Sequence, residues 1–421
     1  MKARTAARIL FRQGPRPRYW ALRRQLDRLR ALGLRKNRAF ARVVARDGLR
    51  FVTGAVRPVR GEAAPRARAA VAWLLRAQDA TPDDGVSLGY FPCDPAATAG
   101  WLDSYPETTG YIVPTLLEFA GRFGRDDVRD RALRMAAWEI QVQMPSGAVQ
   151  GGTVRSPDRQ VAAVFNTGMV LHGYTAAYRA TGERRFLEAG RRAADFLVAD
   201  MDAGGHFRSH GAFVTQHLIK TYNCLCGWAL WRFGEDAGEE RYAKVAIRAA
   251  ESAVGQQGPT GWFANNCLVD PDAPLSHTIG YTLQGILEVG ILSGREDLVD
   301  AARRGVDPLL SRISPRGFLH GCFFSDWEPA TFSSCLTGSA QIAVVCFRLH
   351  EHTGAPQYLL AAERLTDYLK ALQILGSADP GMDGVLGGSF PLFGSYMTAG
   401  YPNWGTKYFL DALLWQHRRG G

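Results

Sequence analysis

The sequence predicts an all-α protein whose helices form an (α/α)6 toroid, a ring of six helical hairpins. The first observation is a glycine that recurs near the start of six apolar segments, at Gly110, Gly168, Gly227, Gly280, Gly338 and Gly405. Their successive spacings are 58, 59, 53, 58 and 67 residues, about the length of two helices with their loops. Helical repeats must stack to bury a continuous core, and a small fixed number of them can close into a ring. An open solenoid is the alternative.

The second observation is that two kinds of helical segment alternate along the chain. Amphipathic segments carry Ala and Leu on one side and Arg on the other, and they cover residues 66–78, 129–143, 186–200, 242–254, 298–310 and 358–372. Each precedes a segment that is apolar almost all round, at 111–123, 168–181, 227–233, 280–292, 338–349 and 405–415. Since a helix without a polar face requires burial on every side, the second set predicts an inner layer and the first an outer layer.

The third observation concerns the ends of the repeat and its loops. The first and last inner segments both begin with Tyr-Pro, at Tyr105 and Tyr401, which favours a closed ring over a solenoid. The loops that lead from outer to inner segments are long, at 144–165, 201–221, 256–276, 311–333 and 375–400, whereas the return loops are short. Long loops inside a compact domain are usually functional. We therefore expect a substrate cleft where they meet, at the N-terminal ends of the inner helices.

The charge divides the chain into two predicted parts, a basic amphipathic N-terminal arm at 1–62 and a catalytic toroid at 63–421. Residues 1–60 hold eighteen Arg and Lys against two Asp, a charge of +16, so the remainder of this +10 chain carries −6. Leucines at 22, 26, 29 and 32 lie at helical spacing among arginines, which fits an anionic membrane surface or an acidic partner. An extension that packs on the globule and a transit peptide are the alternatives. Nucleic acid is not an expected partner.

Cysteine content and hydropathy indicate the cellular compartment of the protein. Seven cysteines and the absence of an apolar signal-peptide core predict a reduced, cytoplasmic protein, with peripheral contact at the inner membrane through the arm. No run reaches the roughly 18 to 20 apolar residues of a membrane-spanning helix. No metal or cofactor is expected, because Cys224-x-Cys226 lacks the spacing of common zinc sites and no Gly-Gly pair opens a phosphate-binding loop.

Glu107 is the strongest candidate for a general acid or base, because a helix start on the ring axis would hold its carboxylate rigidly. Aromatic, amide and charged side chains at the same rim suit a sugar, whose ring has apolar faces and a hydroxyl edge. The predicted substrate-binding residues are Tyr105, Asp158, Arg159, Asn166, Tyr222, Asn223, Trp262, Asp326, Trp327, Asn403 and Trp404. Glycoside hydrolysis ordinarily needs a second carboxylate. Asp158, Asp326 and Glu328 could each supply it.

Two other functions stay open. His277 and Tyr281 are four residues apart and share one face of the fourth inner helix. Together with Lys407 they could abstract a proton beside a uronate carboxylate, as a lyase or C5-epimerase does. The second alternative is a non-catalytic glycan-binding scaffold.

The motif Tyr105-Pro106-Glu107-Thr108-Thr109-Gly110-Tyr111 resembles one of the bacterial polysaccharide biosynthesis protein VpsJ family. The phrase Ala180-Thr181-Gly182-Glu183-Arg184-Arg185-Phe186-Leu187 resembles six-hairpin glycosidases. The two resemblances cover residues 66–416 and imply an (α/α)6 protein of exopolysaccharide or capsule biosynthesis that acts on an oligo- or polysaccharide. The sequence lacks the acid-pair contexts of unsaturated glucuronyl hydrolases and the His motifs of N-acylglucosamine 2-epimerases.

Overall fold

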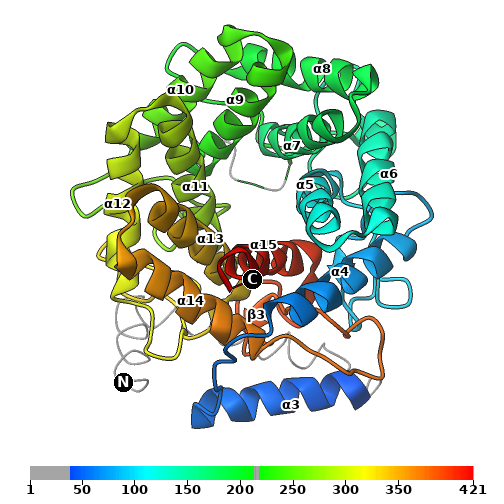
Figure 1. Ribbon diagram of the computed structural model, residues 1–421, viewed down its shortest axis with the longest axis vertical. Coiled ribbons are helices and arrows are strands. Elements are labelled where there is room, and N and C mark those ends of the chain that lie inside the picture. The colour runs from blue at the N-terminus through cyan, green and yellow to red at the C-terminus, as the bar shows by residue number, and fades with distance from the viewer. Residues whose placement is uncertain (1–37, 213, 215–217, 421) are drawn as a thin grey trace.

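A computed structural model describes residues 38–212, 214 and 218–420, and it confirms the predicted (α/α)6 toroid. Around the axis lie the inner helices α5 (Pro106–Phe123), α7 (Val164–Thr181), α9 (Leu225–Ala237), α11 (Ser276–Ser293), α13 (Leu336–Thr353) and α15 (Asn403–Gly420) (Figure 1). Outside them lie α4 (Ala63–Asp79), α6 (Asp126–Val142), α8 (Arg184–Asp200), α10 (Glu240–Val254), α12 (Glu296–Leu310) and α14 (Pro356–Lys370). Along the chain an outer helix precedes each inner one, as the two kinds of segment predict. In space each inner helix packs most closely against the outer helix that follows it, and α15 packs against α4.

The remaining elements are short and belong to the loops, apart from the N-terminal helix α3 (Arg38–Thr53). The 3-10 turns are η1 (Pro157–Arg159) and η2 (Thr221–Cys224). Strand β1 (Gly89–Tyr90) pairs antiparallel with β4 (Tyr401–Pro402), and β2 (Ser334–Cys335) pairs antiparallel with β3 (Ser389–Phe390). Each strand precedes or borders the start of an inner helix, so the pairs brace that end of the ring.

The ring closes where α15 meets the first hairpin. Helix α15 packs against α4 and α5 as well as against α13. At its first residue, the buried Asn403 amide donates to the Ser87 carbonyl at 2.8 Å and to the Thr108 hydroxyl at 2.7 Å. The Asn403 backbone N–H adds a bond to the Leu88 carbonyl at 3.0 Å. The last unit is therefore hydrogen-bonded to the first, which excludes the open solenoid.

Glycine allows the inner helices to approach one another closely, as the recurring pattern predicts. A Cβ on Gly110 of α5 would lie 2.5 Å from the Cα of Val170 on α7. A Cβ on Gly338 of α13 would lie 2.6 Å from the backbone N of His277 on α11. Real Cβ atoms do not approach backbone atoms so closely, so both glycines are required by the packing of the inner layer.

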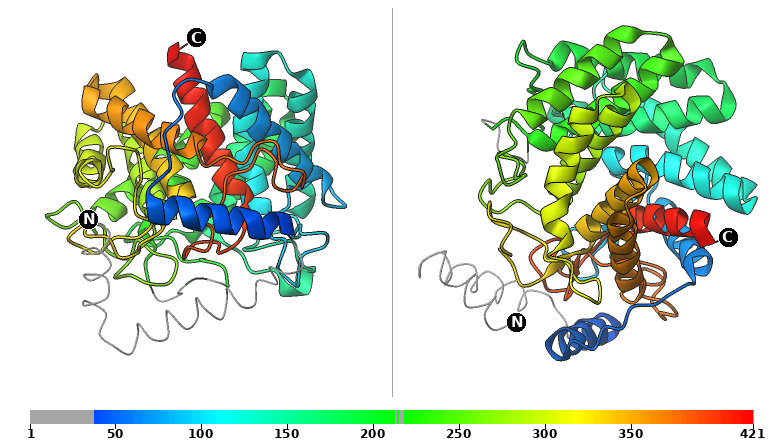
Figure 2. Two further views of the ribbon diagram at one scale, coloured as in Figure 1. Left: turned by 90° about the horizontal axis from the view of Figure 1, so that it is seen from below. Right: turned by 60° about the vertical axis from the view of Figure 1, so that its left-hand side comes forward.

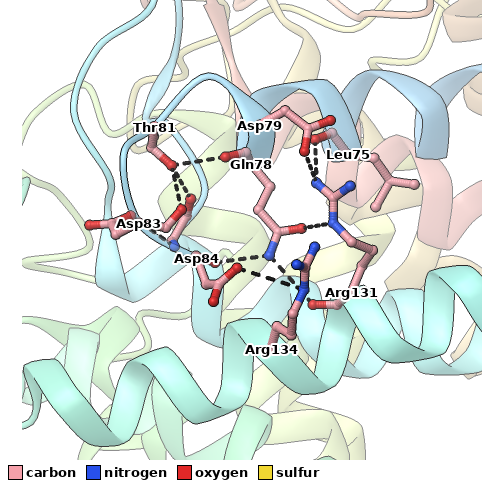
Figure 3. Close-up of polar contacts among 9 residues, drawn as sticks. Leu75, Gln78, Asp79, Thr81, Asp83, Asp84, Arg131 and Arg134 are labelled. Carbon is pink, nitrogen blue, oxygen red and sulfur yellow. Dashed lines mark hydrogen bonds and ion pairs between the residues drawn. The ribbon is translucent and has the colours of Figure 1, made fainter.

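A side-chain network ties the first two outer helices together (Figure 3). Arg131 of α6 donates to the Gln78 side chain and to Asp79, each at 2.5 Å, at the C-terminal end of α4. Gln78 in turn donates to the Asp84 carbonyl at 3.0 Å, and Asp84 pairs with Arg134 at 3.7 Å. The turn between α4 and the first inner helix is thereby held against α6.

Part of the predicted arm packs on the toroid. Phe40 of α3 is fully buried and lies edge-on to Tyr401, with ring centroids 6.3 Å apart. The ring centroids of Phe51 and Phe390 are 5.9 Å apart, and the Arg50 guanidinium donates to the Ala371 carbonyl at 2.9 Å. The leucine stripe at 22–32 lies outside the described residues.

The two ends of the barrel differ. The left view of Figure 2 shows the long loops and α3 gathered at one end, where the inner helices begin, and the C-terminal end of α15 at the other. The short connections between inner and outer helices, such as 124–125 and 182–183, lie at that second end. Among the helices of the described ranges, none has the length and apolarity that crossing a membrane requires.

The close approach at Gly110 predicts a large and local stability effect. Replacing Gly110 with Ala should lower the free energy of unfolding by about 1 to 3 kcal/mol, because Val170 and its backbone must move. Gly121 is the matched control, since it lies on the same helix, is exposed and has open space around it. Gly121→Ala should instead stabilise by about 0.5 to 1 kcal/mol. Urea unfolding of both variants measures this, and equal effects would contradict the packing explanation.

Candidate functional site

The start of α5 fixes Glu107 in place. Pro106 occupies the first helical position, where its missing N–H costs nothing. The backbone N–H of Tyr105 donates to the Val86 carbonyl at 2.9 Å, and the N–H of Val86 donates to the Thr109 hydroxyl at 2.9 Å. These bonds attach the first turn of α5 to the loop that the network of Figure 3 supports. The carboxylate of Glu107 is thus carried by a rigid element.

Burial dominates the electrostatics of Glu107. Its residue is only 8% exposed, and its Oε2 accepts a hydrogen bond from the Tyr105 hydroxyl at 2.7 Å. Desolvation raises the pKa of Glu107 to about 7, although the Tyr105 bond opposes this rise by favouring the charged form. A carboxyl group whose pKa lies near neutrality can both give and take a proton at physiological pH.

Aromatic side chains from all parts of the ring surround this carboxylate. The negative charge of Glu107 helps to raise the pKa of six tyrosines, which are Tyr105, Tyr111, Tyr222, Tyr281, Tyr396 and Tyr408. Burial is the larger cause in each case. These residues come from α5 and the residue before it, from η2, α11 and α15, and from the loop before α15. The closed ring therefore builds an aromatic shell around one acid.

Three predicted substrate-binding aromatics, Tyr105, Tyr222 and Trp404, belong to this shell. Trp404 lies edge-on to Tyr105, with ring centroids 6.0 Å apart, and its indole N–H donates to the Tyr396 hydroxyl at 2.7 Å. Tyr222 lies edge-on to Phe165 at 5.2 Å. Asn166 is buried beside Tyr105 and donates to the Gln150 carbonyl at 3.0 Å. The structure thus brings Tyr105, Asn166, Tyr222 and Trp404 together around Glu107.

His277 and Tyr281 lie in the same shell and share a helix face as predicted, with ring centroids 4.4 Å apart. The His277 Nδ1 is 2.8 Å from the Gln341 side-chain oxygen on α13. Burial lowers the pKa of His277 to about 4, so its imidazole is neutral at physiological pH. Gln341 therefore holds a neutral imidazole beside Tyr281 and Tyr396.

Other predicted site residues lie elsewhere. Asp158 and Arg159 are exposed on η1. Trp262 and Trp327 pair with each other, ring centroids 5.3 Å apart, and the Trp327 indole donates to the Thr260 carbonyl at 2.8 Å. Asp326 is exposed beside them, and its carboxylate accepts a hydrogen bond from a backbone N–H at 3.1 Å. The Trp262 and Trp327 side chains thus contact each other and the loop at Thr260 rather than the Glu107 shell.

Two predicted amides have structural partners. Asn223 lies 3.2 Å from the His210 ring nitrogen, and Asn403 forms the ring closure described above. Glu328, a candidate second acid, pairs with Arg312 at 3.0 Å. The described part of the chain places no second carboxylate among the groups that shift the pKa of Glu107.

Lys407 faces a different space. Its ammonium lies 2.7 Å from the Asp411 carboxylate and over the rings of Tyr111 and Tyr408, at 4.9 and 4.0 Å. These four residues line a cavity of about 440 Å³ among the C-terminal halves of the inner helices. We call it the C-terminal chamber. Glu107, His277 and Tyr281 do not line it, so Tyr111 and Tyr408 separate Lys407 from the predicted acid.

Sequence reasoning missed Gln341 and the C-terminal chamber. Gln341 is a polar residue one turn inside an otherwise apolar inner helix, which was a usable signal. The chamber has a clearer signal in the sequence, because each inner helix carries polar side chains at intervals of three or four residues. Helix α11 shows it at Gln284 and Glu288, and α15 at Lys407 and Asp411.

Comparison with solved structures finds the same fold in sugar-processing enzymes. A heparin-specific unsaturated glucuronyl hydrolase matches with TM-score 0.66 and 15% identity over 85% of this chain and 97% of that chain. The unsaturated glucuronyl hydrolase of Bacillus sp. GL1, responsible for glycosaminoglycan degradation, matches with TM-score 0.65 and 18% identity, over the same 85% and 97%. Cellobiose 2-epimerase of Bacillus thermoamylovorans B4167 matches with TM-score 0.62 and 12% identity over 81% and 95%.

These likenesses confirm the predicted six-hairpin glycosidase-like fold, and at such identities they establish the fold alone. Comparison with protein-family models and with curated protein sequences gives no match. The resemblance to the VpsJ family therefore stays a prediction.

The raised pKa of Glu107 predicts a pH-dependent cost to stability. The folded state holds the proton more tightly than the unfolded chain, whose carboxyl titrates near 4.5, so stability falls as pH rises from about 4.5 to 7. The free energy of unfolding of the wild type, relative to Glu107→Gln, should drop by about 3 kcal/mol across this window. Denaturant titrations of both proteins at several pH values measure this difference. A difference that does not change with pH would show that Glu107 is not desolvated.

Proposed function

We propose that this protein is a carbohydrate-active enzyme that uses Glu107 as a general acid or base on a glycan. The observation that carries the proposal is the buried carboxyl group of Glu107, which has a pKa of about 7 and is held in the first turn of α5 inside a shell of tyrosine and tryptophan. Aromatic faces stack on sugar rings, and their hydroxyl and indole groups bond sugar hydroxyls. The fold likeness to glucuronyl hydrolases and an epimerase supports the same class of substrate.

The position of the site supports an anionic sugar. The shell lies where six inner helices begin, and helix N-termini carry partial positive charge from their unpaired N–H groups. A uronate carboxylate would gain from this field. Glu107 in its protonated form would not repel such a substrate and could deliver its proton to a glycosidic oxygen.

Glycosidase-like acid/base chemistry is the first candidate reaction. Protonating the leaving oxygen requires an acid that keeps its proton at neutral pH, which burial gives to Glu107. The same carboxylate, once ionised, can then take a proton from the attacking water. Tyr105 donates to the ionised form and so stabilises it between the two steps.

Uronate lyase or C5-epimerase chemistry is the second candidate, favoured by the geometry of His277. A neutral imidazole held by Gln341 and packed on Tyr281 can abstract a proton from carbon beside a carboxylate. Lys407, predicted to assist this reaction, lies beyond Tyr408 and is neutralised by Asp411. His277 and Tyr281 therefore carry this candidate.

We also infer a role in exopolysaccharide or capsule biosynthesis, from the resemblance of the Glu107 motif to the VpsJ family. In this setting the basic arm would hold the enzyme at an anionic membrane surface. Liposome pelleting with and without residues 1–60 tests this, since vesicles rich in anionic lipid should retain only the longer protein. Equal binding of both proteins would exclude membrane recruitment by the arm.

Replacing Glu107 with Gln should lower turnover by about 10² to 10⁴-fold, because the isosteric amide keeps the shell but exchanges no proton. Candidate substrates are uronate-containing oligosaccharides. Turnover is measured by the release of reducing ends and by the mass of the products. Glu139→Gln is the matched control, since Glu139 is also fully buried but belongs to the outer helix α6. Its variant should keep full turnover.

Three outcomes separate the candidate functions. Loss of reducing-end release in Glu107→Gln alone supports the glycosidase-like reaction. Solvent deuterium found at carbon 5 of the product supports the epimerase, and a product with a double bond between carbons 4 and 5 supports the lyase; either should be lost in His277→Ala. Binding of glycan without turnover in the wild type, or full turnover in a folded Glu107→Gln variant, refutes the proposed role of Glu107.

A further inference from the structure

The C-terminal chamber is built by the same inner helices as the Glu107 shell, but from their other halves. Going along α15, Trp404 lies in the shell, Lys407 and Asp411 lie on the chamber floor, and Trp415 and Arg418 lie farther along toward the helix end. Residues three or four apart on a helix share a face, so one stripe of each inner helix serves both spaces. Tyr111 and Tyr408 form the layer between the two spaces.

The basic side chains of the chamber are all paired with carboxylates. Five basic and four acidic side chains line it, and each of the basic ones has an acidic partner, which belongs to the lining in three cases and lies beside it in two. The pairs are Arg179–Asp236 at 2.7 Å, Arg232–Glu235 at 3.0 Å, Arg348–Glu288 at 3.1 Å, Lys407–Asp411 at 2.7 Å and Arg418–Glu118 at 2.8 Å. An anion entering the chamber would therefore compete with a carboxylate for every cation.

The helix dipoles act against an anion as well. The mouth of the chamber lies where the inner helices end, and helix C-termini carry partial negative charge. This field is opposite to the one at the Glu107 shell. Toward the mouth, the Arg179 and Glu351 side chains are 32% and 47% exposed, whereas Lys407 on the floor is 9% exposed. The chamber is thus open to solvent and narrows to a buried polar floor.

The lining combines aromatic faces with hydrogen-bonding groups. Trp228 of α9 and Trp415 of α15 come from units on opposite sides of the ring, and the rings of Tyr111 and Tyr408 lie at the floor. The Lys407 ammonium has three donors and gives one to Asp411, so it can donate to further hydroxyl groups. His172, whose Nε2 has no hydrogen-bond partner among the described residues, and Gln284 add neutral polar groups.

We infer that the C-terminal chamber is a second carbohydrate site, distinct from the Glu107 shell, that binds a neutral mono- or disaccharide. A volume of about 440 Å³ lies within the range of small-molecule sites. The Trp228 ring suits an apolar face of a pyranose, whereas Trp415 is already covered by Arg418 and Phe347. The Lys407–Asp411 pair suits the hydroxyl edge of the sugar through charge-assisted bonds. The pairing of every lining cation with a carboxylate and the C-terminal dipoles select against uronates and phosphates.

Filling the chamber tests this inference. Ala176 of α7 lines the chamber, so Ala176→Trp should weaken binding of glucose and cellobiose at least tenfold in isothermal titration calorimetry. Ala180 lies one turn farther along the same helix, is exposed and does not line the chamber. Ala180→Trp should bind both sugars as the wild type does. Circular dichroism and thermal unfolding verify that both variants are folded.

The Glu107→Gln variant separates the two sites, because it alters the shell and leaves the chamber intact. It should bind the neutral sugars with wild-type affinity, and Trp228→Ala should bind them at least tenfold more weakly. Three results would overturn the inference. The first is that the wild type binds no neutral sugar, and the second is that binding is lost in Glu107→Gln but kept in Ala176→Trp. The third result is that glucuronate or inorganic phosphate binds the wild type as tightly as glucose does and loses this binding in Ala176→Trp.

Discussion

The closure of the ring at α15 is the constraint on which the rest of the structure depends. A fully buried amide, Asn403, bonds the last hairpin to Ser87 and Thr108 of the first. Closure gives every inner helix two inner neighbours, which is why segments apolar on all sides are stable here. It also requires the close contacts that Gly110 and Gly338 allow. An open stack would leave one face of the terminal inner helices in water.

The chemistry of Glu107 follows from this closure. In a free helix its first-turn carboxylate would be favoured by the dipole and would stay ionised. Inside the ring, aromatic side chains from several units remove its water, and desolvation overrides the Tyr105 hydrogen bond. The shifted pKa is thus a property of the assembled ring. The same burial keeps His277 neutral, so the shell contains two proton-exchanging groups with opposite shifts.

The two halves of the barrel differ because all six inner helices run in the same direction. Their N-termini converge at the shell and their C-termini converge at the chamber mouth, so the dipole fields at the two ends have opposite sign. The side chains follow this polarity. The shell holds aromatic residues around one acid, whereas the chamber carries paired charges. The proposed preference of the shell for an anionic sugar and of the chamber for a neutral one both derive from this arrangement.

The sequence by itself determined the architecture, since the period of about 58 residues and the alternation of apolar and amphipathic segments admit few folds. It also determined that Glu107 begins an inner helix and that His277 and Tyr281 share a face, because both statements depend only on local spacing. Which rim residues meet was decided by the tertiary structure. Trp262, Asp326 and Trp327 belong to long loops whose path no local pattern fixes, and Asn403 is used for closure. The chamber and the pKa of Glu107 likewise arise only when side chains from distant units meet, because volume and desolvation are properties of the packed ring.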